Sequence, residues 1–163
     1  MINRKNYFLL FIGLLIGQLL PAQPKQGQMA AEIALPSAAG DTLKLSSLRG
    51  KIVLLDFWAS WCGPCRMSNR SLTKIYDKFK GKGFEIYSVS LDDEKEEWVK
   101  AIKKDKINWL QVIDRGGWET KTAQRWGIYA LPTSFLIDKD GTLLAMDLTG
   151  KELEKALKEL IDK

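Results

Sequence analysis

The chain has 163 residues, a formal net charge of +5 and no histidine. Without histidine, Ser-His-Asp catalysis, Cys-His catalysis and CxxCH haem attachment are excluded. The only cysteines, Cys62 and Cys65, are too few for a zinc site, which needs about four ligands. Basic and acidic residues are interspersed along the chain, which indicates solvated helix faces rather than a nucleic-acid surface.

Residues 1–22 have the layout of a secretory signal peptide. A cationic start precedes an apolar run from Tyr7 to Leu20, interrupted by Gln18, and Pro21 with Ala22 ends it. This run of 14 residues is short against the roughly 20 that cross a bilayer. Both cleavage after Ala22 and an uncleaved signal anchor remain open, because Leu20 stands where small residues precede a cut. In both cases the folded domain is expected outside the cytoplasm.

Residues 23–31 are polar, small and unpatterned, so we expect a flexible linker before a domain that spans residues 32–163. The segment DTLKLSSLRGK, residues 41–51, predicts a short strand and a turn at Gly50. Residues 52–57 are apolar apart from Asp56, which is typical of a strand buried on both faces of a sheet.

A helix is expected to follow, with Pro64 in its first turn and an end at Gly81 or Gly83. Further strands are predicted at 84–92, 109–114, 133–137 and 143–148, and further helices at 94–106, 117–128 and 151–162. DKDG, residues 138–141, predicts a hairpin turn in which Gly141 takes a positive φ. This order of elements indicates an α/β sandwich with a mixed sheet.

The two cysteines lie at the predicted strand-to-helix junction. There the first sulfur faces unpaired N–H groups of the helix, which favour a thiolate and lower its pKa from 8.5 to about 7 or below. Cys62 is therefore the expected nucleophile, and Cys65, one turn into the helix, is expected to be shielded. A static staple is the alternative, but closing so short a loop removes little chain entropy, so we favour a redox couple.

Asp56 is a carboxylate inside an apolar strand, six residues before Cys62. Desolvation is expected to raise its pKa. It either forms a hydrogen bond with a neighbouring turn or accepts a proton from Cys65, and we favour the second because carboxylates with perturbed pKa values cluster at functional sites.

The chain also has six tryptophans. They could form a ligand-stacking surface or pack in the core, and we favour the core.

Two segments resemble parts of thioredoxins. IVLLDFWASWCGPCRM, residues 52–67, is similar to their active-site segment, including the aspartate, the Trp-x-x-Trp-Cys spacing and the Gly-Pro pair. GIYALPTSFLIDKDG, residues 127–141, resembles the segment in which a cis-proline faces the disulfide. With the export signal, the leading strand pair and an insertion from about residue 94 to 125, residues 32–163 resemble TlpA/ResA-like thiol–disulfide oxidoreductases.

The resemblance implies a thioredoxin-like three-layer sandwich: a mixed central sheet with helices on both faces, an inserted helix–strand unit and an N-terminal strand extension. It implies that Cys62 is the attacking thiol, Cys65 the resolving thiol and Asp56 the buried proton carrier. It also implies a set of substrate-binding residues around the disulfide: Trp61, Gly63, Pro64, Leu131 and Pro132. Pro132 is expected to be cis, because cis bonds occur essentially only before proline; an ordinary proline at a strand start is the alternative.

The sequence departs from the family pattern at three positions. Arg70 replaces a proline, Ser68 a glutamate common in exported relatives, and Ser88 a lysine near the buried aspartate. Without that lysine the pKa of Asp56 is expected to rise further. These changes leave the reaction class intact and the redox potential open.

The Gly-Pro pair and Asp56 favour a reductant of extracytoplasmic protein disulfides. The resemblance implies no cofactor beyond the Cys62–Cys65 disulfide, no metal, a membrane thiol donor of the DsbD/CcdA kind, and oxidised exported proteins such as apocytochrome c as substrates. A periplasmic or otherwise extracytoplasmic location follows.

Three other functions are alternatives. A peroxiredoxin is disfavoured, because its peroxide site needs a threonine where Ala59 stands. The same residues would also serve a disulfide isomerase or oxidase, and the scaffold would suit a non-catalytic binding domain.

Overall fold

A computed structural model describes residues 23–162, so the predicted signal segment lies outside the described residues. The strands are β1 (Ala34–Pro36), β2 (Thr42–Lys44), β3 (Ile52–Trp58), β4 (Phe84–Ser90), β5 (Leu110–Ile113), β6 (Thr133–Ile137) and β7 (Leu143–Met146). The helices are α1 (Gly63–Phe79), α2 (Lys95–Lys104), α3 (Lys121–Trp126) and α4 (Gly150–Ile161), with short 3-10 turns η1 (Leu45–Leu48), η2 (Lys80–Lys82) and η3 (Gly117–Glu119).

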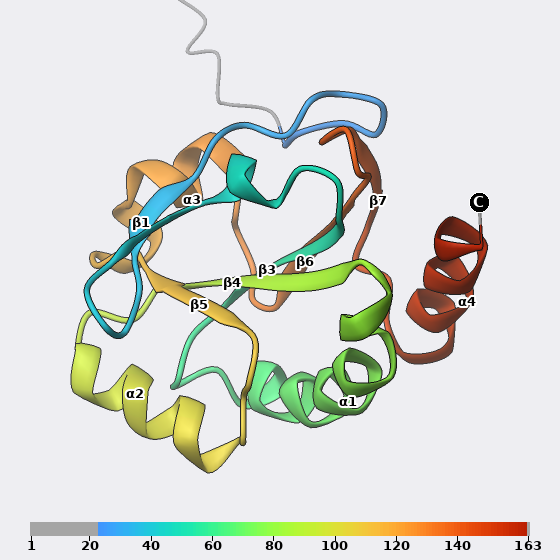
Figure 1. Cartoon of the computed structure of the whole chain (residues 1–163). Helices are drawn as coiled ribbons and strands as arrows, with labels where there is room; N and C mark the ends of the chain where they lie inside the picture. Colours follow the sequence, from blue (N-terminus) through green and yellow to red (C-terminus); the bar gives the residue numbers. More distant parts are fainter. Residues whose placement is uncertain (1–22, 163) are drawn as a thin grey trace, which may run out of the picture.

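Five strands form one mixed sheet in the order β5-β4-β3-β6-β7 (Figure 1). β3 is central, parallel to β4 on one side and antiparallel to β6 on the other. Every residue of β3 and of β4 is buried; β3 is accordingly a near-continuous apolar run, whereas β4 also buries Glu85, Ser88 and Ser90. The predicted mixed sheet is therefore confirmed, and its central strand leads directly to the two cysteines.

Helices cover both faces of this sheet. α1 and α4 pack through Leu72, Ile75 and Leu153 against the face of β3 that carries Leu54. The opposite face, which carries Leu55, is covered by α3 and by the β1–β2 hairpin. Figure 1 shows α3 and β1 on one side of the sheet and α1 with α4 on the other. The three-layer arrangement and the N-terminal strand extension are thus as predicted.

The later part of the expected linker, residues 27–30, pairs with the β6–β7 hairpin instead. Gly27 N–H donates to the Leu143 carbonyl (2.8 Å), Leu143 N–H donates to the Gln28 carbonyl (2.8 Å), and Ala30 N–H donates to the Gly141 carbonyl (2.9 Å). This segment therefore covers the exposed edge of β7. The pairing uses backbone groups, so small polar side chains give no sign of it in the sequence.

The turn chemistry follows the prediction. Gly141 closes the β6–β7 hairpin with φ +95°, and Gly83 ends the helical stretch after α1 with φ +83°. Within residues 23–162, no helix has both the length and the apolar character that a bilayer crossing requires.

Candidate active site

The site is built on the junction between β3 and α1. Cys62 and Cys65 form a disulfide. Cys62 is the N-cap residue of α1, and its sulfur accepts the Cys65 N–H at 3.2 Å. The first sulfur thus lies where the helix offers an unpaired donor, as the spacing predicts. Cys65 is 1% exposed and Cys62 only 5%, so both sulfurs are shielded and Cys62 is the more accessible.

The expected substrate-binding residues surround this disulfide. The Leu131–Pro132 peptide bond is cis, as predicted. Leu131 packs against the buried cluster that contains both cysteines, so the loop before β6 adjoins them. Trp61 is 58% exposed, and Gly63 is also exposed beside Cys62. The residues on both sides of Cys62 in the chain are therefore exposed.

The buried carboxylate of Asp92 stabilises the turn between β3 and α1. Asp92 is 2% exposed and accepts hydrogen bonds from the Ser60 N–H (2.9 Å) and the Ser60 hydroxyl (2.6 Å). The Ser90 hydroxyl donates to the same carboxylate at 2.6 Å. Asp92 therefore anchors the turn that presents Trp61 and Cys62. Sequence reasoning missed it, because an aspartate at the end of a predicted strand is typical of an ordinary turn.

A second anchor begins at the residue after Cys65. The Arg66 guanidinium donates to both carboxylate oxygens of Asp105, which lies at the end of α2, and to the Ser60 carbonyl (3.1 Å). Asn69 donates to Asp105 at 3.2 Å. Burial by itself raises the pKa of Asp105, but the hydrogen bonds from Arg66 and Asn69 outweigh it and hold that pKa below the usual range. Arg66 thereby ties α1, α2 and the active-site turn together.

Asp56 lies in a row of polar side chains across the sheet. It pairs with Ser88 on β4 and with Ser134 on β6, and Ser88 pairs in turn with Gln111 on β5. The Ser88 hydroxyl donates to Asp56 at 3.0 Å and accepts the Trp109 indole N–H at 2.8 Å. Ser88 therefore serves as a neutral donor to the aspartate, at the position where the family pattern has a lysine.

The electrostatics of Asp56 agree with the prediction of a raised pKa. Asp56 is 3% exposed. Its burial raises the pKa, the hydrogen bond from Ser88 lowers it, and the negative charge of Asp147 raises it again, to about 7 in total. A group with this pKa exchanges its proton readily near neutral pH, as a general acid–base catalyst requires.

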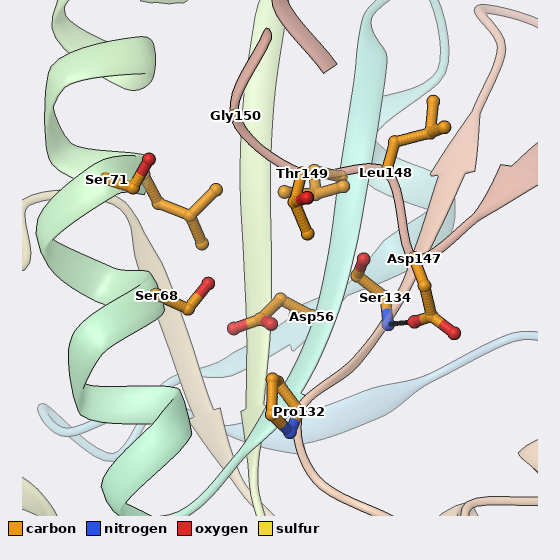
Figure 2. A pocket seen from close by; sticks show the side chains of 11 residues that line it. Asp56, Ser68, Ser71, Pro132, Ser134, Asp147, Leu148, Thr149 and Gly150 are labelled. Carbon is orange, nitrogen blue, oxygen red and sulfur yellow. Dashed lines mark hydrogen bonds between the residues drawn. The ribbon is translucent and has the colours of Figure 1, made fainter. Parts of the chain in front are cut away.

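A cavity of about 260 Å³ connects Asp56 with the surface between α1 and the β7–α4 loop. Figure 2 shows Asp56 between Ser68 of α1 and the start of β6, with Pro132 beside it and Asp147 on the far side of Ser134. Ser134 N–H donates to Asp147 at 2.8 Å. Ser68 lines the cavity, and its short side chain leaves this space open.

The geometry has counterparts in known proteins. Residues 26–146 match the AhpC/TSA family. The chain is 33% identical over 137 residues to the thiol-disulfide oxidoreductase ResA of Bacillus thuringiensis subsp. konkukian, covering 84% of this chain and 77% of the relative.

Solved structures agree. A thiol-disulfide oxidoreductase from Bacteroides fragilis superimposes with a TM-score of 0.76 at 39% identity, over 82% of this chain and 99% of that one. The thioredoxin domain of a thiol-disulfide oxidoreductase from Bacteroides vulgatus gives a TM-score of 0.79 at 34% identity, over 85% and 99% of the two chains. With the disulfide at the start of α1 and the thioredoxin-like sandwich, these similarities show that the chain belongs to the AhpC/TSA family as a ResA-like thiol–disulfide oxidoreductase.

Proposed function

We propose that this enzyme is exported and reduces disulfides of extracytoplasmic proteins through Cys62 and Cys65. The observation that carries the proposal is the disulfide at the start of α1, with a helix N–H directed at the Cys62 sulfur. The apolar segment within residues 1–22 supports export, as a cleaved signal peptide or an anchor. The absence of histidine between the cysteines supports a reductant, because DsbA-like oxidants use a histidine there.

The reaction is a two-step exchange. The Cys62 thiolate attacks one sulfur of the substrate disulfide, and the other substrate sulfur leaves as a thiolate that takes up a proton. The Cys65 thiol loses its proton to Asp56 and attacks the Cys62 sulfur, which releases the second substrate thiolate. Two electrons pass to the substrate, and the enzyme ends with the Cys62–Cys65 disulfide. The cavity beside Asp56 gives its proton a way to solvent.

The redox potential tests the direction of this reaction. We expect a value near that of thioredoxin, about −270 mV, rather than near that of DsbA, about −120 mV. Equilibration of the purified protein with dithiothreitol or glutathione couples gives the value, with the two redox states separated after thiol alkylation. A potential above about −170 mV would show that the protein is an oxidant or isomerase instead.

Substitution of the resolving cysteine tests the two-step route and its partners. Cys65→Ser is expected to accumulate mixed disulfides at Cys62, because no second thiol releases the bound partner. Cys62→Ser, the matched control, is expected to trap nothing. Non-reducing gels and mass spectrometry of trapped proteins then identify the partners, which we propose include exported proteins with oxidised cysteines and a membrane thiol reductant of the DsbD/CcdA type. Equal trapping by both variants would contradict the assignment of Cys62 as the attacking thiol.

A further inference from the structure

The six tryptophans divide into two groups. Four are buried, with exposures of 0 to 6%: Trp58, Trp98, Trp109 and Trp126. The other two are Trp61, 58% exposed, and Trp118, 43% exposed. Core packing explains the first group, as expected from the sequence, but leaves the exposed pair without a role.

The exposed pair is a single feature at the active site. The Trp61 and Trp118 rings contact each other edge to face, with centroids 6.2 Å apart and planes at 62°. Trp61 directly precedes Cys62, whereas Trp118 lies on η3, between β5 and α3 and within the predicted insertion at residues 94–125. The fold thus brings an indole from the insertion against the indole beside the nucleophile.

Two other exposed apolar side chains lie in chain segments next to the cysteine cluster. Among the described residues, the large hydrophobic side chains that are exposed are Met29, Trp61, Met67, Trp118 and Tyr129. Met67 lies one helical turn after Gly63 on α1, and Tyr129 lies two residues before Leu131, which packs against the cysteine cluster. The contact between Trp61 and Trp118 makes their exposed apolar surface continuous, which is typical of a site of interaction.

We propose that Trp61 and Trp118 form a docking platform for an aromatic side chain next to the oxidised cysteine of a polypeptide substrate. The proposal rests on the function proposed above and defines its substrate class. An edge-to-face pair leaves ring surface free, and a third aromatic ring can join it at centroid separations of about 4.5 to 7 Å. Trp118, which lies outside the CGPC segment, thereby becomes a residue that determines specificity.

A substrate polypeptide is the occupant because of where the reaction takes place. Cys62 is 5% exposed, so a partner disulfide reaches its sulfur only by lying against the neighbouring surface, which includes Trp61. Trp118 extends that surface by its direct contact with Trp61. The residues that flank the partner's cysteine therefore lie over the indole pair during the exchange.

The test compares peptide disulfides that differ at one position. Homodisulfides of Gly-Gly-Cys-X-Gly, with X as phenylalanine, glycine or lysine, are reduced by the full-length protein in its dithiol form, and kcat/KM is measured by chromatography of the alkylated products. We expect the phenylalanine peptide to react about three- to tenfold faster than the glycine peptide. In Trp118→Ala this ratio should fall below about twofold. Because the readout is a ratio, a general change in activity cancels.

Two further variants and one substrate complete the test. Trp118→Phe retains a ring and should keep most of the preference, and Met29→Ala, which removes an exposed apolar side chain elsewhere, should leave the ratio unchanged. Equal kcat/KM values for the three peptides, a preference for lysine, or an unchanged ratio in Trp118→Ala would contradict the proposed docking platform. None of these results would affect the proposed function. Failure of the wild-type protein to reduce insulin, a protein disulfide substrate, would overturn the proposed function itself, and the platform with it.

Discussion

Replacing Asp56 by asparagine should stabilise the oxidised protein above pH 7. The pKa of Asp56 is about 7 in the folded protein, against an ordinary value of 3.8. Between these values folding takes up a proton, so the free energy of unfolding falls as the pH rises from about 4 to 7 and then levels off. Asparagine carries no charge and still accepts the Ser88 hydroxyl. The gain at pH 8 is expected to be at most about 4 kcal/mol and to vanish near pH 4.

Denaturant unfolding of both proteins at pH 4, 6 and 8 measures this gain. Asp92→Asn is the matched control, because Asp92 is equally buried but accepts three hydrogen bonds through its two carboxylate oxygens. An amide offers one acceptor oxygen, so this variant should lose about 1 to 3 kcal/mol instead. The same chemical change at two buried aspartates should therefore have opposite signs. A wild-type protein as stable at pH 8 as Asp56→Asn would contradict the raised pKa.

The stabilising variant should also be the slower enzyme. Without a proton acceptor for Cys65, the attack on the mixed disulfide is expected to slow on the order of a hundredfold, and the rate should lose its inflection near pH 7. Single-turnover reduction of a peptide disulfide between pH 5 and 9 measures both effects. An inflection near pH 7 that persists in Asp56→Asn would assign it to another group.

The chemistry of the cysteine segment was predictable because it depends on local sequence. The junction of an apolar strand with a helix places Cys62 at the N-cap, and the resemblance to thioredoxins anticipates the cis bond before Pro132. The raised pKa of Asp56 also follows locally, from one carboxylate inside an apolar run. These features needed no knowledge of strand pairing.

The surroundings of Asp56 were not predictable in the same way. Ser134 lies beside Asp56 only because β6 pairs with β3 in one register, and a shift by one residue would place it on the opposite face. Asp147 acts on Asp56 from the loop after β7, with nothing in its own sequence context to mark it. The same holds for Trp118, whose contact with Trp61 depends on how the insertion folds back. These contacts depend on which distant segments of the chain pack together, and local sequence patterns do not encode that.

The role of Arg66 also depends on long-range contacts. Arg66→Leu should lower the free energy of unfolding by about 3 kcal/mol at pH 7. The Asp105 side chain is 4% exposed and relies on the Arg66 guanidinium, so removing the arginine leaves a buried carboxylate without its ionic partner. Arg70→Leu is the matched control, because Arg70 is exposed one turn later on the same helix, and its charge is the weakest of the influences that lower the pKa of Asp105. That control should change stability by no more than about 0.5 kcal/mol.

The pH dependence of the loss separates an unpaired carboxylate from lost packing. In the wild-type protein the lowered pKa of Asp105 contributes stability above the ordinary pKa, which disappears as the pH falls through the folded value. In Arg66→Leu burial acts on Asp105 without the guanidinium, so its pKa should rise from the wild-type value, and acidification should relieve the penalty. The deficit should therefore shrink from pH 7 toward pH 3. Adding Asp105→Leu to Arg66→Leu should recover most of the loss at pH 7, whereas a deficit unchanged by pH or by the second substitution would show that Arg66 contributes through packing alone.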